Sequence, residues 1–418
     1  MDKHAQGRRH FIRQLTAATL TLTGAPVFAE VSMPATPQQP NEAYWEQIKR
    51  QFSVAPGKIM MNAANLCPSP AFVLEKVLEH SRQLNRDVSF QYRNLFNDER
   101  SKAIQALADY TGAAPEEIGI TRNTSESNFL VVNGLELKSG DEVILWDQNH
   151  PSNDVTWQKR AARFGFTVKR LATPANPGTV EELASVFIKA ITPRTRLITF
   201  SHISNTTGVA LPAQLICQQA RAKGVMTLVD GAQSLGSMTI NLPELGCDFF
   251  TASTHKWLMG PMENGLLYVR KERVASLHTS IIGGTWKSTG VTVDDKLCTL
   301  GQRNDPTLVG LPAVAEFHQM IGKPNVEARV RQLTQYLKEQ LQQQIPNVVL
   351  TTPMSPAMSA GIVVLSVPGK DMKDVYTRLY TSFGIAASGT GGIRLSPHVY
   401  NTLADIDKVV GAIVRLCA

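Results

Sequence analysis

The feature that most constrains the fold is a series of short apolar runs, beginning at Glu142, that alternates with longer segments of helical periodicity. The runs are EVILW, FTVKRL, RLITFSH, VMTLVD, CDFFTAS and GLLYVR. Between them, TVEELASVFIKAI and PAQLICQQARAKG repeat apolar residues at helical spacing, and the second ends with basic residues and Gly224. Short strands separated by helices are typical of an α/β protein with a mainly parallel sheet.

The domain organisation follows from a change of pattern near Pro306. Beyond it, the helical segment VEARVRQLTQYLKEQLQQQI precedes the short strands GIVVLSV and GIRLSP, which indicates a smaller α+β domain. A chain of 418 residues is long enough for two domains. We predict a large domain over residues 60–305 and a small C-terminal domain over 306–418. Residues 30–59 form a linker and an N-terminal segment that packs with the small domain.

The N-terminal segment GRRHFIRQLTAATLTLTGAPVFAE resembles a twin-arginine signal peptide over residues 1–29, with cleavage near Ala29. Its apolar stretch is too short and too rich in threonine for a transmembrane helix. We therefore expect a periplasmic protein, exported in folded form by the twin-arginine translocation machinery and without a stable membrane anchor. The alternative interpretation is a mildly basic, disordered tail.

Charge and cysteine usage exclude other classes of function. The formal net charge of +7 is modest for this length and gives no reason to expect a nucleic-acid partner. The five cysteines are scattered without a CxxC pair, and the histidines form no HExxH motif. The sequence therefore predicts neither a disulfide framework nor a metal site.

Polar side chains follow four of the predicted strands. His150 comes after EVILW, Asn205 after RLITFSH, Asp230 and Gln233 after VMTLV, and Lys256 after CDFF. Ligands of open α/β sheets bind beyond the carboxyl ends of the strands, so we expect these side chains to share one site.

This set of residues suits pyridoxal 5′-phosphate (PLP). A lysine amine forms a Schiff base with PLP, and an aspartate keeps the pyridine nitrogen protonated so that the ring accepts electrons. Asp230 fits the second role, although Asp-Gly is also a common turn. Lys256 alone would be interpreted as a surface lysine. A phosphate binds backbone N–H groups at a helix start, which TRNTSESNFLVVNGLEL supplies near Thr124 and Ser125.

The segments LVDGAQSLG, DFFTASTHKWLMGP and NGLLYVR resemble the signature of class V aminotransferases. This family of fold-type I PLP enzymes includes cysteine desulfurases, kynureninases and isopenicillin N epimerase-like proteins. The resemblance extends from about Met60 to the C-terminus. It implies an aspartate aminotransferase-like large domain, a homodimer with a shared active site, and a small-molecule or peptide substrate.

The resemblance also implies roles for individual residues. Lys256 would carry the cofactor and move the substrate proton, Asp230 would hold the pyridinium nitrogen, and His150 would stack on the ring. Gln233 and Asn205 would bind the phenolic oxygen of the ring. The remaining implied contacts are Thr124, Ser125, Ser253 and His255 to the phosphate, Gly284 and Thr285 across the dimer interface, and Arg394, Asn65 and Arg303 to the substrate.

Two segments depart from the family pattern. Cysteine desulfurases carry a nucleophilic cysteine in a loop that reads FGIAASGTGGIR here and contains none. Persulfide chemistry would then need Cys67, for which a buried free cysteine is the simpler interpretation. The segment LGQRNDPTLVGLPAV resembles the Gly-Thr-Arg-Asp stretch of the epimerase-like branch, with Gln302 and Asn304 as replacements. Arg303 would meet either a second acidic group of the substrate or a structural carboxylate.

An exported, epimerase-like member of the family resembles the periplasmic enzymes that tailor the siderophore pyoverdine. We therefore expect transamination or other Cα chemistry on a glutamyl group of the siderophore precursor. Within the family, an amino-acid epimerase or racemase and a C–S lyase are alternatives. From another class, a non-catalytic binding protein on the same fold is a further alternative.

Overall fold

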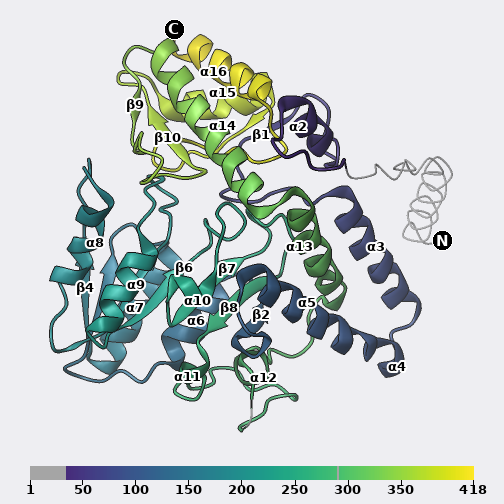
Figure 1. Ribbon diagram of the computed structural model, residues 1–418, viewed down its shortest axis with the longest axis vertical. Coiled ribbons are helices and arrows are strands. Elements are labelled where there is room, and N and C mark those ends of the chain that lie inside the picture. Colours follow the sequence, from purple (N-terminus) through teal and green to yellow (C-terminus); the bar gives the residue numbers. More distant parts are fainter. Residues whose placement is uncertain (1–33, 290) are drawn as a thin grey trace, which may run out of the picture. The chain divides into compact units, whose positions relative to one another are not determined.

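A seven-stranded sheet occupies the centre of the large half of the chain (Figure 1), with the strand order β2-β8-β7-β6-β5-β3-β4. The computed structural model describes residues 34–289 and 291–418, so the predicted signal segment lies outside the described residues. The strands are β2 (Ile118–Thr121), β3 (Glu142–Trp146), β4 (Thr167–Leu171), β5 (Thr195–Ser201), β6 (Met226–Asp230), β7 (Phe249–Ser253) and β8 (Gly265–Val269).

The sheet is mostly parallel, which confirms the predicted fold class. Strands β4, β3, β5, β6 and β7 pair in parallel, whereas β8 runs antiparallel to both of its neighbours, β7 and β2. Every residue of β3, β7 and β8 is buried, as expected for strands covered on both faces. The helices that connect and flank these strands are α6 (Thr124–Gly134), α7 (Pro151–Phe164), α8 (Val180–Lys189), α9 (Ala213–Ala222), α10 (Leu242–Leu245), α11 (Lys271–Val274) and α12 (Val293–Leu297).

Several helices precede the sheet in sequence. They are α2 (Glu42–Lys49), α3 (Ala71–Arg86), α4 (Phe90–Arg93), α5 (Leu95–Thr111) and the 3₁₀ turn η1 (Pro115–Glu117). After the sheet, the 3₁₀ turn η2 (Asp305–Val309) and helix α13 (Gly310–Ile321) pack against α3 and α5. Helix α13 therefore belongs by its contacts to the large half, although it follows Pro306.

The small half is built on an antiparallel sheet of order β12-β10-β9. Leu333, Leu337 and Leu341 lie on one face of helix α14 (Lys323–Gln344) and belong to the apolar core of the small half. Strand β1 (Ile59–Met60) pairs in parallel with β11, and Lys49 of α2 forms a 2.7 Å ion pair with Asp405. The N-terminal segment thus contacts this half. Its elements are α14 (Lys323–Gln344), β9 (Val349–Leu350), β10 (Val363–Ser366), α15 (Met372–Phe383), β11 (Ile385–Ala386), β12 (Ile393–Leu395) and α16 (Leu403–Cys417).

Among the described residues, no helix combines the length and the apolar character needed to cross a membrane.

Three buried histidines give the fold a predictable response to acid. Burial lowers the pKa of His202 and of His398 to about 4, and that of His318 to about 3. The unfolded chain binds protons on these side chains near pH 6.5, whereas the folded chain does so only at much lower pH. The unfolded state therefore binds more protons in this interval, and acid must destabilise the fold.

We predict that the free energy of unfolding falls as the pH is lowered from about 6.5 to about 4, by up to roughly 3 kcal/mol for one such histidine. Urea denaturation at several pH values measures this slope. His202→Gln removes one of the titrating groups. In this variant the slope of the unfolding free energy against pH should decrease by the contribution of about one proton. Equal slopes for the variant and the wild type would contradict the assignment.

Candidate active site

A cavity of about 230 Å³ lies where the carboxyl ends of β5, β6 and β7 meet the first turns of α6 and α7. A larger groove of about 760 Å³ lies against α16, but its lining contains none of the predicted site residues. Most of the predicted site residues line the smaller cavity, and they come from five separate segments of the chain. They number nine: Thr124, Ser125, His150, Asn205, Asp230, Gln233, Ser253, His255 and Lys256.

The start of α6 forms one end of the cavity. Asn123 caps the helix by accepting a 3.0 Å hydrogen bond from the Glu126 N–H. The Thr124 N–H donates to Ser253 Oγ at 2.9 Å, and the hydroxyl groups of these two residues lie 2.6 Å apart. The positive end of the helix dipole and the hydroxyl groups favour an anion at this position.

His255 also lines the cavity and has an unfilled hydrogen-bonding position. Its Nδ1 atom is buried and has no hydrogen-bond partner among the described residues. Burial, reinforced by the neighbouring Lys256, lowers its pKa to about 4, so the ring is neutral at pH 7. A phosphate oxygen would satisfy this atom if Nδ1 carries the ring proton. The observed donors therefore fit the phosphate group of PLP.

Asp230 ends β6 and is 3% exposed. The side-chain amide of Asn128 donates to Asp230 Oδ2 at 2.9 Å and accepts from the Thr251 hydroxyl at 2.8 Å. The Ala232 N–H donates to the other carboxylate oxygen, Oδ1, at 3.1 Å. These contacts hold the carboxylate in one orientation, as a partner for a pyridinium nitrogen requires.

Asn128 is a residue that the sequence analysis missed. It lies four residues after Thr124 on α6, so both side chains project from the same face of the helix. The four-residue spacing from Thr124 was the only sequence pattern that pointed to Asn128. It was not decisive, because a helix face can equally point into an apolar core.

Lys256 follows β7 and begins a turn that is closed by a 2.9 Å hydrogen bond from the Met259 N–H to the Lys256 carbonyl. Burial is the main cause that lowers the pKa of its amine; Arg394 acts in the same direction and Asp230 opposes it. A lowered pKa increases the fraction of neutral amine at pH 7. The neutral amine is the form that attacks the aldehyde of PLP.

His150 caps helix α7 from the rim of the cavity. Its Nδ1 accepts a 3.2 Å hydrogen bond from the Ser152 N–H. Burial is the largest cause that lowers its pKa, and Lys256 and Arg394 add to it while Asp230 opposes it. A neutral imidazole at this place is suited to lie against an aromatic ring.

Arg394 lies on β12, next to the cavity but not in its lining. It donates to the Asn205 carbonyl at 3.0 Å and to Asn62 Oδ1 at 3.1 Å, and burial lowers its pKa to about 10. It therefore stays cationic at pH 7. Asn65, the predicted substrate residue from the same loop as Asn62, is exposed and does not line the cavity. Asn62 is the residue of that loop that contacts Arg394, and the sequence analysis did not single it out.

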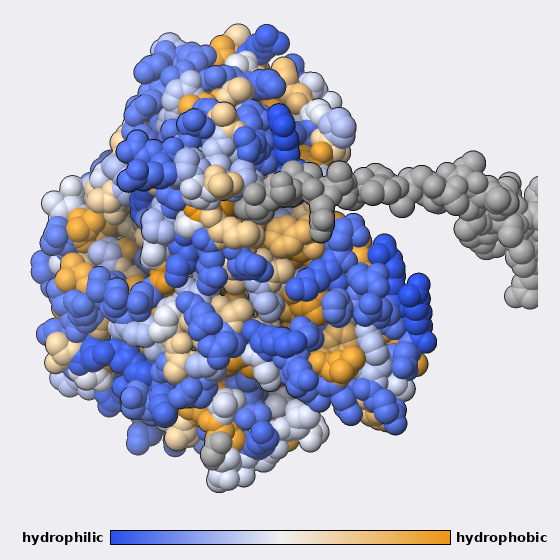
Figure 2. Space-filling view, turned by 45° about the vertical axis from the view of Figure 1, so that its right-hand side comes forward, coloured by the Kyte–Doolittle hydropathy of each residue, from blue (hydrophilic) through white to orange (hydrophobic). Residues whose placement is uncertain are grey.

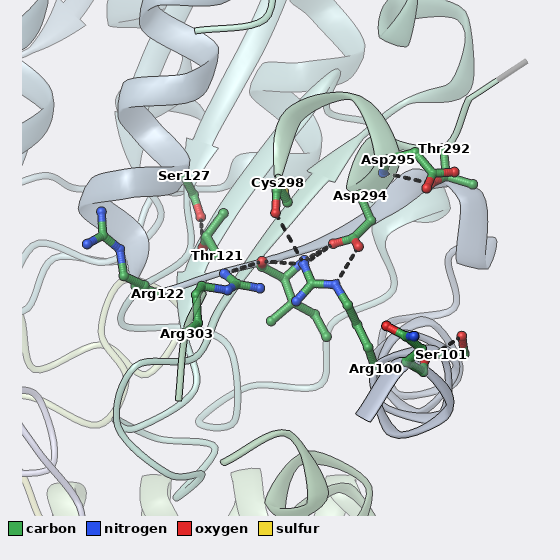
Figure 3. A network of polar contacts seen from close by, with 12 residues as sticks. Arg100, Ser101, Thr121, Arg122, Ser127, Thr292, Asp294, Asp295, Cys298 and Arg303 are labelled. Carbon is green, nitrogen blue, oxygen red and sulfur yellow. Dashed lines mark hydrogen bonds and ion pairs between the residues drawn. The ribbon is translucent and has the colours of Figure 1, made fainter. Parts of the chain in front are cut away.

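Three predicted residues lie away from this cavity within the same chain. Gly284 and Thr285 are exposed and do not line it, so their predicted contact across a dimer interface stays a prediction. Arg303 donates to the Ile120 carbonyl at 2.9 Å (Figure 3). Beside it, Arg100 forms a 2.6 Å ion pair with Asp294 and donates to the same carbonyl. The carboxylate in this network therefore pairs with Arg100.

None of the five cysteines lines the cavity. Cys67 is 5% exposed, and burial raises the pKa of its thiol to about 12, so it is not a thiolate at pH 7. The loop before Arg394 forms a tight turn in which the hydroxyl groups of Ser388 and Thr390 lie 2.9 Å apart. No nucleophilic sulfur is present there.

Residues 62–409 match the family model Aminotransferase class-V. Isopenicillin N epimerase from Amycolatopsis lactamdurans is 28% identical, and the alignment covers 89% of this chain and 98% of the relative. A probable cysteine desulfurase from Pyrococcus abyssi is also 28% identical, with 85% and 92% covered.

Solved structures have the same fold. The complex between the cystine C–S lyase C-DES and its product, cysteine persulfide, matches with a TM-score of 0.81 at 26% identity, covering 88% of this chain and 100% of that chain. A C-DES variant with glycine covalently linked to the PLP cofactor also matches with a TM-score of 0.81, at 24% identity, covering 90% and 100% of the two chains. The chain therefore belongs to the class V aminotransferase family, and it is a PLP-dependent enzyme of fold-type I.

Proposed function

We propose that this enzyme acts on the amino group of an amino acid, either free or carried by a peptide, and that Lys256 is its PLP-bearing residue. The observation that carries the proposal is the placement of the Lys256 amine. It lies in a cavity that joins the start of α6 to the oriented Asp230 carboxylate, and its pKa is lowered. When bound, PLP supplies the electron sink for reactions at the substrate Cα.

The residues of the chain have separate roles in binding and proton transfer. The first turn of α6, Ser253 and His255 would hold the phosphate, and the Asp230 carboxylate would accept a hydrogen bond from the protonated pyridine nitrogen. Lys256 Nζ carries the proton to and from the substrate Cα. The guanidinium of Arg394 remains charged at pH 7 and presents a planar set of N–H donors to the substrate carboxylate.

The cysteines support chemistry at Cα over persulfide formation by the enzyme itself. Cys67 is the only cysteine in the predicted substrate loop, and its thiol is buried, protonated and outside the cavity lining. Epimerisation, transamination and C–S bond cleavage need no cysteine of the enzyme. Two of the three named relatives, an isopenicillin N epimerase and a cystine C–S lyase, support this group of reactions.

As the specific function, we propose periplasmic tailoring of a siderophore of the pyoverdine type at a glutamyl group. The support is the combination of the twin-arginine motif at Arg8 and Arg9 with the similarity to an epimerase over 98% of that relative. An amino-acid epimerase and a C–S lyase are the competing functions.

We also propose a homodimer. Large apolar side chains are exposed on and around α3 and α4 (Figure 2), in a region that a second copy of the chain would cover. Helix α3 is amphipathic in sequence, yet Val73 is its only buried residue. The exposed side chains include Phe72, Leu74, Leu78, Val88 and Phe90.

The proposed role of Lys256 predicts a specific chemical result. Borohydride treatment of the PLP-loaded protein should remove the absorption band of the linked cofactor and attach the reduced cofactor to Lys256, as peptide mass spectrometry measures. Lys256→Ala should bind PLP without this attachment and lose at least about 10³-fold in kcat. Attachment to a different lysine would contradict the proposal.

The candidate reactions predict different products. Incubation with a glutamyl siderophore precursor should yield a keto product and the pyridoxamine form of the cofactor if the enzyme transaminates. Epimerisation should instead exchange the Cα proton for deuterium without loss of the amine, and C–S cleavage should release sulfur species from cystine. Turnover of cystine alone would overturn the siderophore proposal.

The hydrogen bond from Asn128 to Asp230 predicts a loss of cofactor affinity when it is removed. Asn128→Leu leaves Asp230 Oδ2 and the Thr251 hydroxyl without their partner, so we expect PLP affinity to fall about 10-fold and stability to fall by roughly 1–3 kcal/mol. Cofactor titration and urea denaturation measure the two effects. Asn133→Leu is the control, because Asn133 is half-buried on the same helix and its side chain bonds, among the described residues, only to the Phe129 carbonyl; it should change neither by more than about 0.5 kcal/mol.

The export proposal predicts that Arg8→Lys combined with Arg9→Lys traps the precursor in the cytoplasm. Cell fractionation followed by immunoblotting measures the distribution. The wild-type chain should appear in the periplasm, and equal export of the double variant would rule out the twin-arginine route.

A further inference from the structure

Trp257 follows Lys256 in sequence and is hydrogen-bonded to a residue of the candidate site. It is fully buried, and its indole N–H donates to Gln233 Oε1 at 2.8 Å. Gln233 lines the cavity. We propose that Trp257 is a positioning residue that determines which end of the Gln233 amide faces the cavity. This inference rests on the proposed PLP site and specifies how its polar groups are oriented.

Two neighbours of Gln233 select the same orientation of its amide. The indole N–H can only donate, so it requires the oxygen end of the amide. The Ala64 carbonyl can only accept, so it requires the nitrogen end, and Gln233 Nε2 lies 3.0 Å from it. The Nε2 group has two hydrogens, and one remains after the bond to Ala64 is made. The group available to the cavity is therefore an N–H donor.

The indole ring cannot easily turn away from this position. A Cβ atom built on Gly361 would lie only 2.3 Å from the ring, and one built on Gly236 would lie 2.4 Å from the Trp257 carbonyl group. Neither position has room for a side chain, so both glycines pack directly against the tryptophan. Gly361 belongs to the small half of the chain, which therefore takes part in holding the ring.

His398, also from the small half, holds the backbone of Trp257. Its Nδ1 accepts a 2.7 Å hydrogen bond from the Val399 N–H, so the ring proton must be on Nε2. Nε2 lies 2.7 Å from the Trp257 carbonyl oxygen and donates to it. The backbone and the ring of Trp257 are thus both restrained, and the restraint passes to Gln233 through one hydrogen bond.

The orientation matters because the phenolic oxygen of bound PLP carries negative charge. An N–H donor stabilises that oxygen, whereas an amide carbonyl in the same place would repel it. Without the indole N–H, the Gln233 amide has one fewer partner to select its orientation, and the donor is presented less consistently. Trp257 would therefore influence the cofactor without touching it.

The test compares Trp257→Phe with the wild type, both loaded with PLP, by titrating the absorption band of the bound cofactor against pH. A donor stabilises the phenolic oxygen most in the high-pH form, in which no neighbouring proton shares its charge. Loss of the oriented donor should therefore shift the midpoint upward by about one pH unit. An unchanged midpoint would show that Trp257 only packs.

A double-mutant cycle tests whether Trp257 acts through Gln233. Gln233→Leu should raise the midpoint by itself, and adding Trp257→Phe to it should produce no further shift. Additive shifts would overturn the proposal. If Trp257→Phe does not fold, the tryptophan isostere 3-benzothienyl-alanine at position 257 keeps the ring shape and lacks only the N–H donor, and the same shift is expected.

Trp146 provides the matched control. It is also fully buried, and its indole N–H donates to the Thr173 hydroxyl at 3.2 Å, outside the cavity lining. Trp146→Phe should lower stability without moving the midpoint. The experiments distinguish failure of the Lys256 proposal from failure of the Trp257 proposal. A wild-type chain that borohydride does not label at Lys256 refutes the PLP assignment. Labelling with an unchanged midpoint in Trp257→Phe refutes only the role of Trp257.

Discussion

The register of three parallel strands is the constraint on which the site depends. Ser201 of β5 pairs with Asp230 of β6, and Asp230 pairs with Thr251 of β7, so the three residues lie side by side at one edge of the sheet. A slip of one residue would turn each side chain to the opposite face. Phe200, Val229 and Phe250, which precede them on the strands, are fully buried on the opposite face. A slip would place the polar side chains in these apolar positions, which opposes it.

The ends of apolar runs were the most informative part of the sequence. His150, Asn205, Asp230 and Lys256 each follow such a run, and a parallel sheet brings the ends of its strands together, so their meeting could be predicted without coordinates. Strand β2 was not predicted, because four residues, IGIT, carry little periodicity and gain their place by pairing with the distant β8. When a strand depends on long-range pairing, its own residues do not predict where it begins and ends.

The residues that orient the site were harder to predict than those that form it. Asn62, Asn128 and Trp257 act through hydrogen bonds to Arg394, Asp230 and Gln233 respectively. Each of these bonds joins residues brought together only by the tertiary fold, and a lone Asn or Trp in a sequence is more often a cap, a turn or part of the core. Local patterns therefore revealed the polar groups, while their orientation depended on contacts that only the folded chain makes.

Burial has the same electrostatic effect on three basic groups in and beside the cavity. Burial lowers the pKa of Lys256, His255 and Arg394, because removing a cation from water disfavours its charged form. An anionic ligand would reverse much of this cost for Arg394 and would complement the helix start at Thr124. The cavity is thus better suited to a cofactor with a phosphate and a substrate with a carboxylate than to neutral molecules. Because Arg394 belongs to the small half of the chain, the proposed recognition of a substrate carboxylate would depend on both halves.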